Sequence, residues 1–208
     1  MSDTAKLIYV YDPMCSWCWG FTPAWQQLKQ ALDGIVTIEY RVGGLAPDSS
    51  EPMPEHMQHM LQNTWHTISN KLGTKFNFDF WHTCQPRRST YPACRAALLA
   101  RKVKKESQMI EAIQHAYYLQ ARNPSNKSVL AEIAQELGIA SQEDFEQQLN
   151  STVLDQELMT EIAQVRTLPI QGFPSLILIA HDSVYPIPID YTQWQLTHTT
   201  IERIVSQV

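Results

Sequence analysis

Two cysteines separated by two residues, Cys15 and Cys18, stand between a short apolar segment and the start of a helical pattern. The segment from Leu7 to Tyr11 is rich in β-branched and aromatic residues, which predicts a strand buried on both faces. We expect a helix to begin near Ser16, which places Cys15 at its tip. There, free backbone N–H groups and the positive end of the helix dipole favour a thiolate. Because the thiolate is the nucleophile, this placement indicates a reactive cysteine.

The surrounding chain predicts a strand–helix–strand unit. The helix is expected to be interrupted near Gly20, to restart with Thr22 as N-cap and Pro23 in its first position, and to end at Gly34. Residues 36–42 then alternate between apolar and polar side chains, which predicts a second strand. A crossover of this size implies parallel, right-handed pairing of the two strands.

Residues 47–166 have helical spacing almost throughout. Ser141 and Asp144 form a capping-box-like pair at one expected helix start. The aromatic stretch from Phe76 to Trp81 is expected to be a loop that belongs to the core, to a binding rim or to an interface. The expected helices cover residues 57–72, 91–105, 108–122, 128–137, a segment opened by residue 141, and 154–165.

Strands return after this block. Ser175–Ala180 and Val184–Ile189 flank a polar turn, which predicts a hairpin, and Pro186 places the second strand at the edge of the sheet. Thr192 and Gln195 are expected to form a capping box for a terminal helix. The expected inward face of that helix is Ile201, Ile204, Val205 and Val208.

This order of elements, with Cys-x-x-Cys at the first strand–helix junction, resembles the thioredoxin fold (βαβ…ββα) with a large all-helical insertion. This α/β architecture is that of DsbA-like thiol–disulfide oxidoreductases. A second motif, Gly172-Phe173-Pro174-Ser175, precedes the third strand, and Pro174 matches the cis-proline that packs beside the cysteine pair in thioredoxin-like proteins. The resemblance implies a discontinuous thioredoxin-like domain (1–46 and 167–208) and an inserted helical domain (47–166).

The run from Cys15 to Phe21 also resembles the cytosolic disulfide-isomerase branch of that family. It departs from the periplasmic oxidant, which has Pro-His where this chain has Ser16-Trp17. No imidazole is therefore offered to the thiolate, and we expect a less oxidising protein. Phe173 replaces the small or β-branched residue usual before the cis-proline, which is expected to reshape the substrate groove.

The resemblance implies a thiol–disulfide oxidoreductase or disulfide isomerase. Cys15 would attack a substrate sulfur, and Cys18 would resolve the mixed disulfide. Ser16, Trp17, Phe173 and Pro174 are the expected substrate-binding residues, and Trp19 and Phe21 are further candidates for an apolar rim. Expected substrates are disulfides and dithiols of proteins or small molecules. We expect no metal and no cofactor besides the cysteine pair, with glutathione as a possible co-substrate.

Two alternatives remain open from the residues. Kappa-class glutathione transferases and related isomerases resemble the same architecture, although they need only one nucleophile. A non-enzymatic zinc site would join Cys15 and Cys18 to Cys84 and Cys94, although a second Cys-x-x-Cys is missing. Cys84 and Cys94 could also form a second redox pair or be buried as small apolar residues. The His and Met residues at 53–60 invite a metal site, but His56 and His59 are expected to be surface residues.

Composition excludes several classes of protein. The net charge of −5 argues against nucleic-acid binding. No apolar run approaches the length that spans a bilayer, and no signal-like segment opens the chain, so we expect a cytoplasmic location without membrane partners. Four cysteines among 208 residues are too few for a disulfide scaffold.

Overall fold

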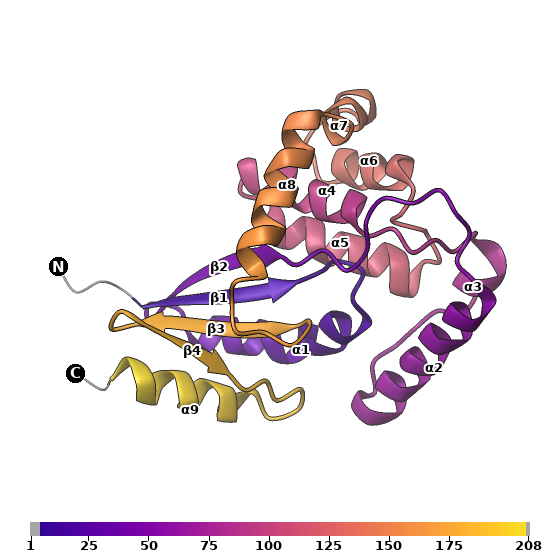
Figure 1. Cartoon of the computed structure of the whole chain (residues 1–208). Coiled ribbons are helices and arrows are strands. Elements are labelled where there is room, and N and C mark those ends of the chain that lie inside the picture. The colour runs from indigo at the N-terminus through magenta and orange to yellow at the C-terminus, as the bar shows by residue number, and fades with distance from the viewer. Residues whose placement is uncertain (1–4, 207–208) are drawn as a thin grey trace.

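The computed structural model describes residues 5–206, and within them four strands form one mixed sheet (Figure 1). The strand order is β2-β1-β3-β4, with β1 parallel to β2 and antiparallel to β3. The predicted parallel pairing and the edge position of the last strand are therefore confirmed. The strands are β1 (Lys6–Tyr11), β2 (Thr37–Val42), β3 (Ser175–Ala180) and β4 (Ser183–Ile187).

Helices cover both faces of this sheet. Figure 1 shows α1 and α9 on one side of it and α8 on the other, with α4 to α7 grouped beyond α8 and with α2 and α3 extending to one side. The helices are α1 (Ser16–Ala31), α2 (Glu55–Leu72), α3 (Phe80–Thr83), α4 (Tyr91–Lys102), α5 (Glu106–Leu119), α6 (Lys127–Glu136), α7 (Gln142–Leu149), α8 (Thr152–Val165) and α9 (Trp194–Val205).

The first helix is continuous, so the predicted interruption near Gly20 and the predicted cap at Thr22 are wrong. Gly20 meets a tertiary need instead, because a Cβ there would lie 2.9 Å from Cγ2 of Ile68 in α2. The Thr22 hydroxyl bonds back to the Cys18 carbonyl, 3.2 Å away, and Pro23 is accommodated inside the helix. Close packing between α1 and α2 therefore explains the glycine better than a turn does.

Other helix ends also differ from the predictions, among them both ends of α5 (Glu106–Leu119), which was expected over 108–122. The helix expected over 91–105 stops at Lys102, and Lys104 takes a left-handed backbone with φ of 60°. Thr192 does not cap α9. Instead, the carboxylate of Asp190 accepts hydrogen bonds from the backbone N–H groups of Thr192 (2.8 Å) and Gln193 (2.7 Å).

The predicted cap of α7 and the predicted inward face of α9 agree better with the structure. Ser141 caps α7 by accepting from the Asp144 N–H, as predicted. Ile201 of α9 is buried, its neighbours Ile204 and Val205 are half-buried, and Val208 lies outside the described residues.

One apolar cluster runs from the sheet through α1 into α4, α5 and α6. The proposed division at residues 46 and 167 stays a prediction beside this continuous core. Among residues 5–206, no helix combines the length and apolarity needed to cross a membrane.

Candidate active site at the tip of helix α1

Cys15 lies where the loop after β1 meets the loop before β3. It is the N-cap of α1, and its Sγ accepts a hydrogen bond from the Cys18 backbone N–H at 3.3 Å. The same thiol donates to the backbone carbonyl of Phe173 at 3.4 Å. A helix-tip N–H group and a loop carbonyl therefore hold this sulfur from opposite sides.

Cys18 lies one turn further along α1 and is fully buried. Burial raises the pKa of its thiol well above the usual value, and the neighbouring Cys15 raises it further. Tyr9 of β1 is close behind, since both cysteines add to the effect of burial in raising the pKa of its hydroxyl. The two thiols thus differ in environment, and Cys18 is held protonated.

A buried carboxylate, Asp12, fixes the loop between β1 and α1. It accepts hydrogen bonds from the backbone N–H groups of Met14 and Leu45, both at 2.8 Å, and from the Thr90 hydroxyl at 2.7 Å. Burial raises its pKa, and these donors oppose that rise. The sequence analysis missed this residue, because an Asp after a strand has no local feature that sets it apart from a surface turn residue.

Ser16 connects the cysteine loop to the helical segment. Its hydroxyl accepts a hydrogen bond from Nε1 of Trp65, 3.0 Å away, and both side chains are buried. Trp65 is the centre of an aromatic cluster that includes most of the stretch from Phe76 to Trp81. Of the three roles left open for that stretch, the structure assigns core packing.

Phe173 and Pro174 reach the site from the loop that directly precedes β3. The peptide bond between them is cis, and both side chains are half-buried. The phenyl ring packs against Gly43 at the end of β2, where a Cβ would overlap with it. Gly43 is therefore needed because of Phe173, the residue in which this chain departs from the usual pattern.

A cavity of about 250 Å³ opens beside Cys15. Four of the six predicted site residues line it together, namely Cys15, Ser16, Trp17 and Phe173, whereas Cys18 and Pro174 are not among its lining residues. Sequence reasoning missed the remaining lining residues, which come from α2, α5, the loop before α1 and the segments before α2 and α4. They are Met14, Leu45, Met53, Met60, Leu61, Thr64, Arg87, Arg88, Thr90 and Tyr117.

The aromatic residues around the cysteines divide between cavity and core. Trp17 lines the cavity, and its ring meets Tyr191 edge to face with centroids 5.5 Å apart. Trp19 instead stacks on Tyr118, and Phe21 is fully buried. The expectation that Phe21 joins an apolar rim is therefore wrong, whereas Trp19 is half-buried and lines a different pocket, so its place in a rim stays a prediction.

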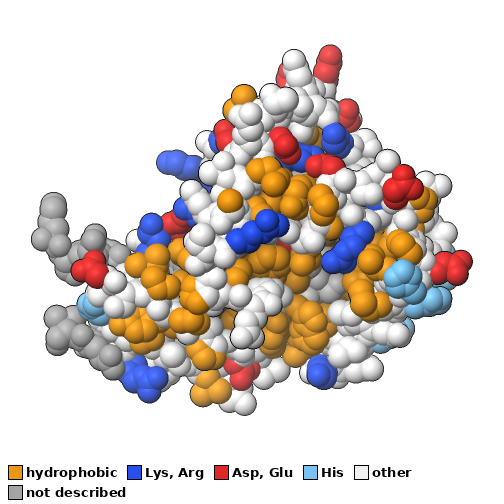
Figure 2. Space-filling view, in the orientation of Figure 1, with side chains coloured by type: hydrophobic (Ala, Val, Ile, Leu, Met, Phe, Trp, Pro, Cys, Tyr) orange, Lys and Arg blue, Asp and Glu red, His pale blue; other side chains and the backbone are white. Residues whose placement is uncertain are grey.

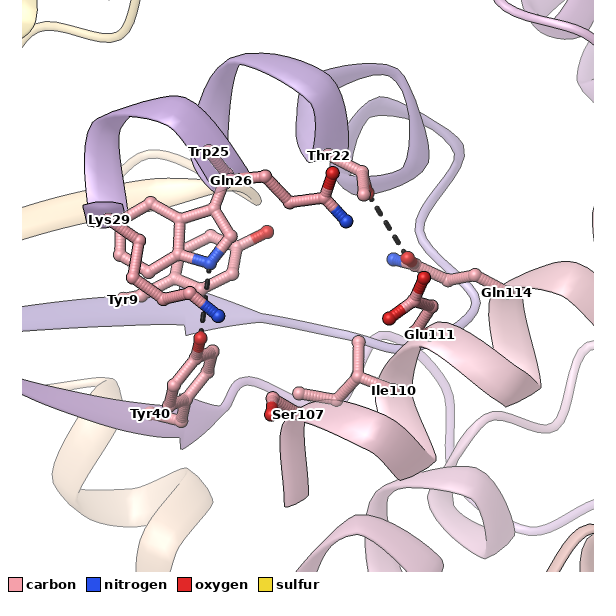
Figure 3. Close-up of a pocket in the computed structure, with 10 residues that line it drawn as sticks. All are labelled: Tyr9, Thr22, Trp25, Gln26, Lys29, Tyr40, Ser107, Ile110, Glu111 and Gln114. Carbon is pink, nitrogen blue, oxygen red and sulfur yellow. Dashed lines mark hydrogen bonds between the residues drawn. The ribbon is translucent and has the colours of Figure 1, made fainter. Parts of the chain in front are cut away.

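A second, smaller cavity of about 70 Å³ lies between α1, α5 and the sheet (Figure 3). Figure 3 shows Thr22 of α1 bonded to Gln114 of α5, and Trp25 bonded to Tyr40 of β2. No cysteine lines this cavity. The Thr22–Gln114 hydrogen bond beside it joins α1 to the helical segment.

The remaining cysteines are held by separate partners. Cys84 donates to the Ala121 carbonyl at 2.9 Å, whereas Cys94 is fully buried with its Sγ 3.5 Å from an Asp12 oxygen. All four thiols are free, and no three His, Cys, Asp or Glu side chains among residues 5–206 are grouped as a metal site would require. This arrangement gives no support to a zinc site or to a second redox pair. His56 and His59 are exposed on α2.

A cysteine pair at the first strand–helix junction, a proline loop opposite and a four-stranded mixed sheet define a thioredoxin-like protein with an inserted helical segment. The family described as DSBA-like thioredoxin domain matches residues 6–187. The chain belongs to that family, whose members are thiol–disulfide oxidoreductases. No curated protein matches the sequence.

Solved structures agree with this fold. A proposed protein disulfide isomerase from Nitrosomonas europaea superposes with a TM-score of 0.84 at 25% identity, over 99% of each chain. The cytosolic disulfide reductase DsbM from Pseudomonas aeruginosa superposes with a TM-score of 0.77 at 22% identity, over 95% of this chain and 97% of that one. DsbM with glutathione gives 0.74 at 22% identity, over 95% and 98%.

Proposed function

We propose that this protein reduces or isomerises disulfides by dithiol–disulfide exchange, with Cys15 as nucleophile and Cys18 as resolving thiol. One observation carries the proposal: Cys15 faces a cavity while its partner is fully buried behind it. A substrate sulfur that enters the cavity meets Cys15 first. Trp17 and Phe173 supply apolar surface on either side of the point of attack.

The first step forms a mixed disulfide. The Cys15 thiolate attacks one sulfur of a substrate R–S–S–R′, so that a Cys15–S–R bond forms and R′–S⁻ leaves and takes up a proton. The Cys18 N–H continues to bond the Cys15 sulfur, while deprotonation removes its bond to the Phe173 carbonyl. That carbonyl then accepts an N–H from an extended substrate, as in strand addition.

The second step releases the substrate. Cys18 loses its proton and attacks the Cys15 sulfur, a Cys15–Cys18 disulfide forms, and R–S⁻ leaves and takes up a proton. Two electrons have then passed from the protein dithiol to the substrate disulfide. Two molecules of a thiol such as glutathione restore the dithiol and become one disulfide. Isomerisation follows when the mixed disulfide is attacked by another substrate thiol before Cys18 acts.

The preferred direction is expected to be reduction or isomerisation in a cytoplasmic, reducing environment. Support comes from Ser16-Trp17, because the Ser16 hydroxyl is engaged by Trp65 and neither residue offers a cation to the Cys15 thiolate. A dipeptide that adds no charge of its own favours a weaker oxidant than one that contains an imidazole. DsbM is described as cytosolic and as a reductase, which agrees with this direction.

The proposal is tested by glutathione-dependent reduction of insulin with single cysteine variants. We expect Cys15→Ser to abolish turnover and Cys18→Ser to accumulate a mixed disulfide visible by mass spectrometry. Cys84→Ser is the matched control, since this half-buried thiol donates to the Ala121 carbonyl and does not line the cavity, and it should keep wild-type turnover. Unchanged turnover in Cys15→Ser would contradict the mechanism. Conjugation of glutathione to an electrophile that persists in Cys18→Ser would favour the transferase alternative.

A further inference from the structure

Two arginines stand beside the reactive thiol in a chain whose net charge is −5. Arg87 and Arg88 line the cavity that Cys15 faces, and no Asp, Glu or Lys is among its lining residues. Figure 2 shows one face of the molecule, with hydrophobic side chains across its middle and Lys and Arg side chains among them. The cavity is therefore apolar and locally cationic.

The segment that holds these arginines is tied down on both sides. The Pro86 carbonyl accepts from the Met53 N–H at 2.8 Å, and the Thr90 N–H donates to Ala46 at 3.0 Å. On the other side, the Ser125 hydroxyl donates to the Ser89 carbonyl at 2.8 Å. A segment fixed in this way loses little conformational entropy when a ligand binds.

The two arginines have different partners. Arg87 donates to the Ser125 carbonyl at 2.9 Å and to the Asn126 side chain, so its guanidinium is already used within the fold. Arg88 is exposed, and its side chain makes no hydrogen bond or ion pair with any residue between 5 and 206. Arg88 lines the cavity together with Tyr117. Burial and the buried Asp12 raise the pKa of the Tyr117 hydroxyl, and the Arg88 charge opposes that rise.

We propose that Arg88 binds a carboxylate of a small peptide disulfide, of the glutathione type, while Cys15 attacks its sulfur. A guanidinium pairs with a carboxylate through two parallel hydrogen bonds, and here no acidic lining residue competes for it. A space of about 250 Å³, bounded by Met60, Leu61 and Thr64 of α2, suits a few residues better than a folded protein segment. This inference rests on the proposed disulfide exchange and names its substrate class.

The test compares charged and neutral substrates with Arg88→Gln, Arg88→Lys and Arg166→Gln. Arg166 is an exposed arginine outside the cavity and serves as the control. For oxidised glutathione, with dithiothreitol as the reductant that restores the Cys15–Cys18 dithiol and the uncatalysed rate subtracted, we expect Arg88→Gln to raise KM about tenfold with kcat unchanged, which corresponds to about 1.4 kcal/mol. For glutathione disulfide with esterified carboxylates, Arg88→Gln should change KM less than about twofold, because this substrate has no carboxylate charge for Arg88 to pair with. Arg88→Lys should fall between, and Arg166→Gln should match wild type.

Binding of S-methylglutathione, which has no disulfide to exchange, separates the two proposals. Calorimetric titration should show affinity that falls in Arg88→Gln and with added salt. If wild type reduces no disulfide but this binding pattern holds, the proposed function fails while the carboxylate site stands. If wild type reduces both oxidised glutathione and its esterified form, and Arg88→Gln changes the two KM values equally or not at all, the Arg88 site is refuted while the proposed function stands. A KM effect confined to insulin and absent with oxidised glutathione would refute the small-peptide class.

Discussion

Replacement of Ser16 by alanine tests how the cysteine loop is joined to the helical segment. The Ser16 hydroxyl is the acceptor for the Trp65 indole N–H, 3.0 Å away, and Trp65 is fully buried. Removal of the acceptor leaves a buried donor unpaired, which costs about 1–3 kcal/mol. For a chain of this size, each kcal/mol lowers Tm by about 2–4 °C, so we expect a loss of about 2–12 °C.

Thermal and urea unfolding of Ser16→Ala measure this cost, with Ser50→Ala as control because Ser50 is exposed. A double-mutant cycle isolates the bond, since Trp65→Phe removes the donor but keeps an aromatic ring. In the Trp65→Phe background, Ser16→Ala should cost at least about 1 kcal/mol less than it does in wild type. An equal cost in both backgrounds would refute the reasoning, because the stability would then depend on Ser16 by another route.

Three further predictions concern other contacts. Gly43→Ala should displace the Phe173 ring, with a loss of about 1–3 kcal/mol in urea unfolding and an altered KM for insulin; the loss should vanish in a Phe173→Ala background. Asp48→Asn should cost about 1 kcal/mol at pH 7, because half-exposed Asp48 pairs with buried Arg95, whose guanidinium lowers the Asp48 pKa. That stabilisation is complete above the unfolded pKa near 3.9 and is lost as pH falls through the lower folded pKa, so wild type and variant should converge in unfolding titrations below about pH 4. Asp190→Ala should cost about 0.5–1.5 kcal/mol by chemical unfolding, because the turn that leads into α9 loses its acceptor; Asp190→Asn, which keeps an oxygen, should cost less.

The sequence was sufficient for those parts of the fold whose signals are local. The apolar run at β1 and the proline in β4 each record burial or an edge position in the residues themselves, and the structure has both as expected. Cys15 and Phe173 could be placed in one site because the order of elements resembles a known fold. Their separation of 158 residues gives no such signal by itself.

The sequence predictions failed or fell short where the role of a residue depends on a partner far away in the sequence. Gly20 resembles a helix break, but it is small because Ile68 packs against it. Asp12 resembles a turn residue, but its oxygens bind N–H groups from two separate loops. Arg88 resembles an ordinary surface cation until the segment that holds it is placed beside Cys15. None of these roles depends on spacing along the chain, so no periodicity could have revealed them.

The hydrogen bond between the Cys15 thiol and the Phe173 carbonyl also bears on biosynthesis. It joins residues 158 positions apart, and the pairing of β1 with β3 brings the loop that contains Phe173 next to Cys15. A growing chain therefore exposes both cysteines long before the carbonyl that faces them exists. Contacts of such long sequence range form late. Until then the Cys-x-x-Cys segment lacks half of its surroundings, and chemical labelling of Cys15 in chains truncated before residue 173 would report how much of its reactivity the finished fold supplies.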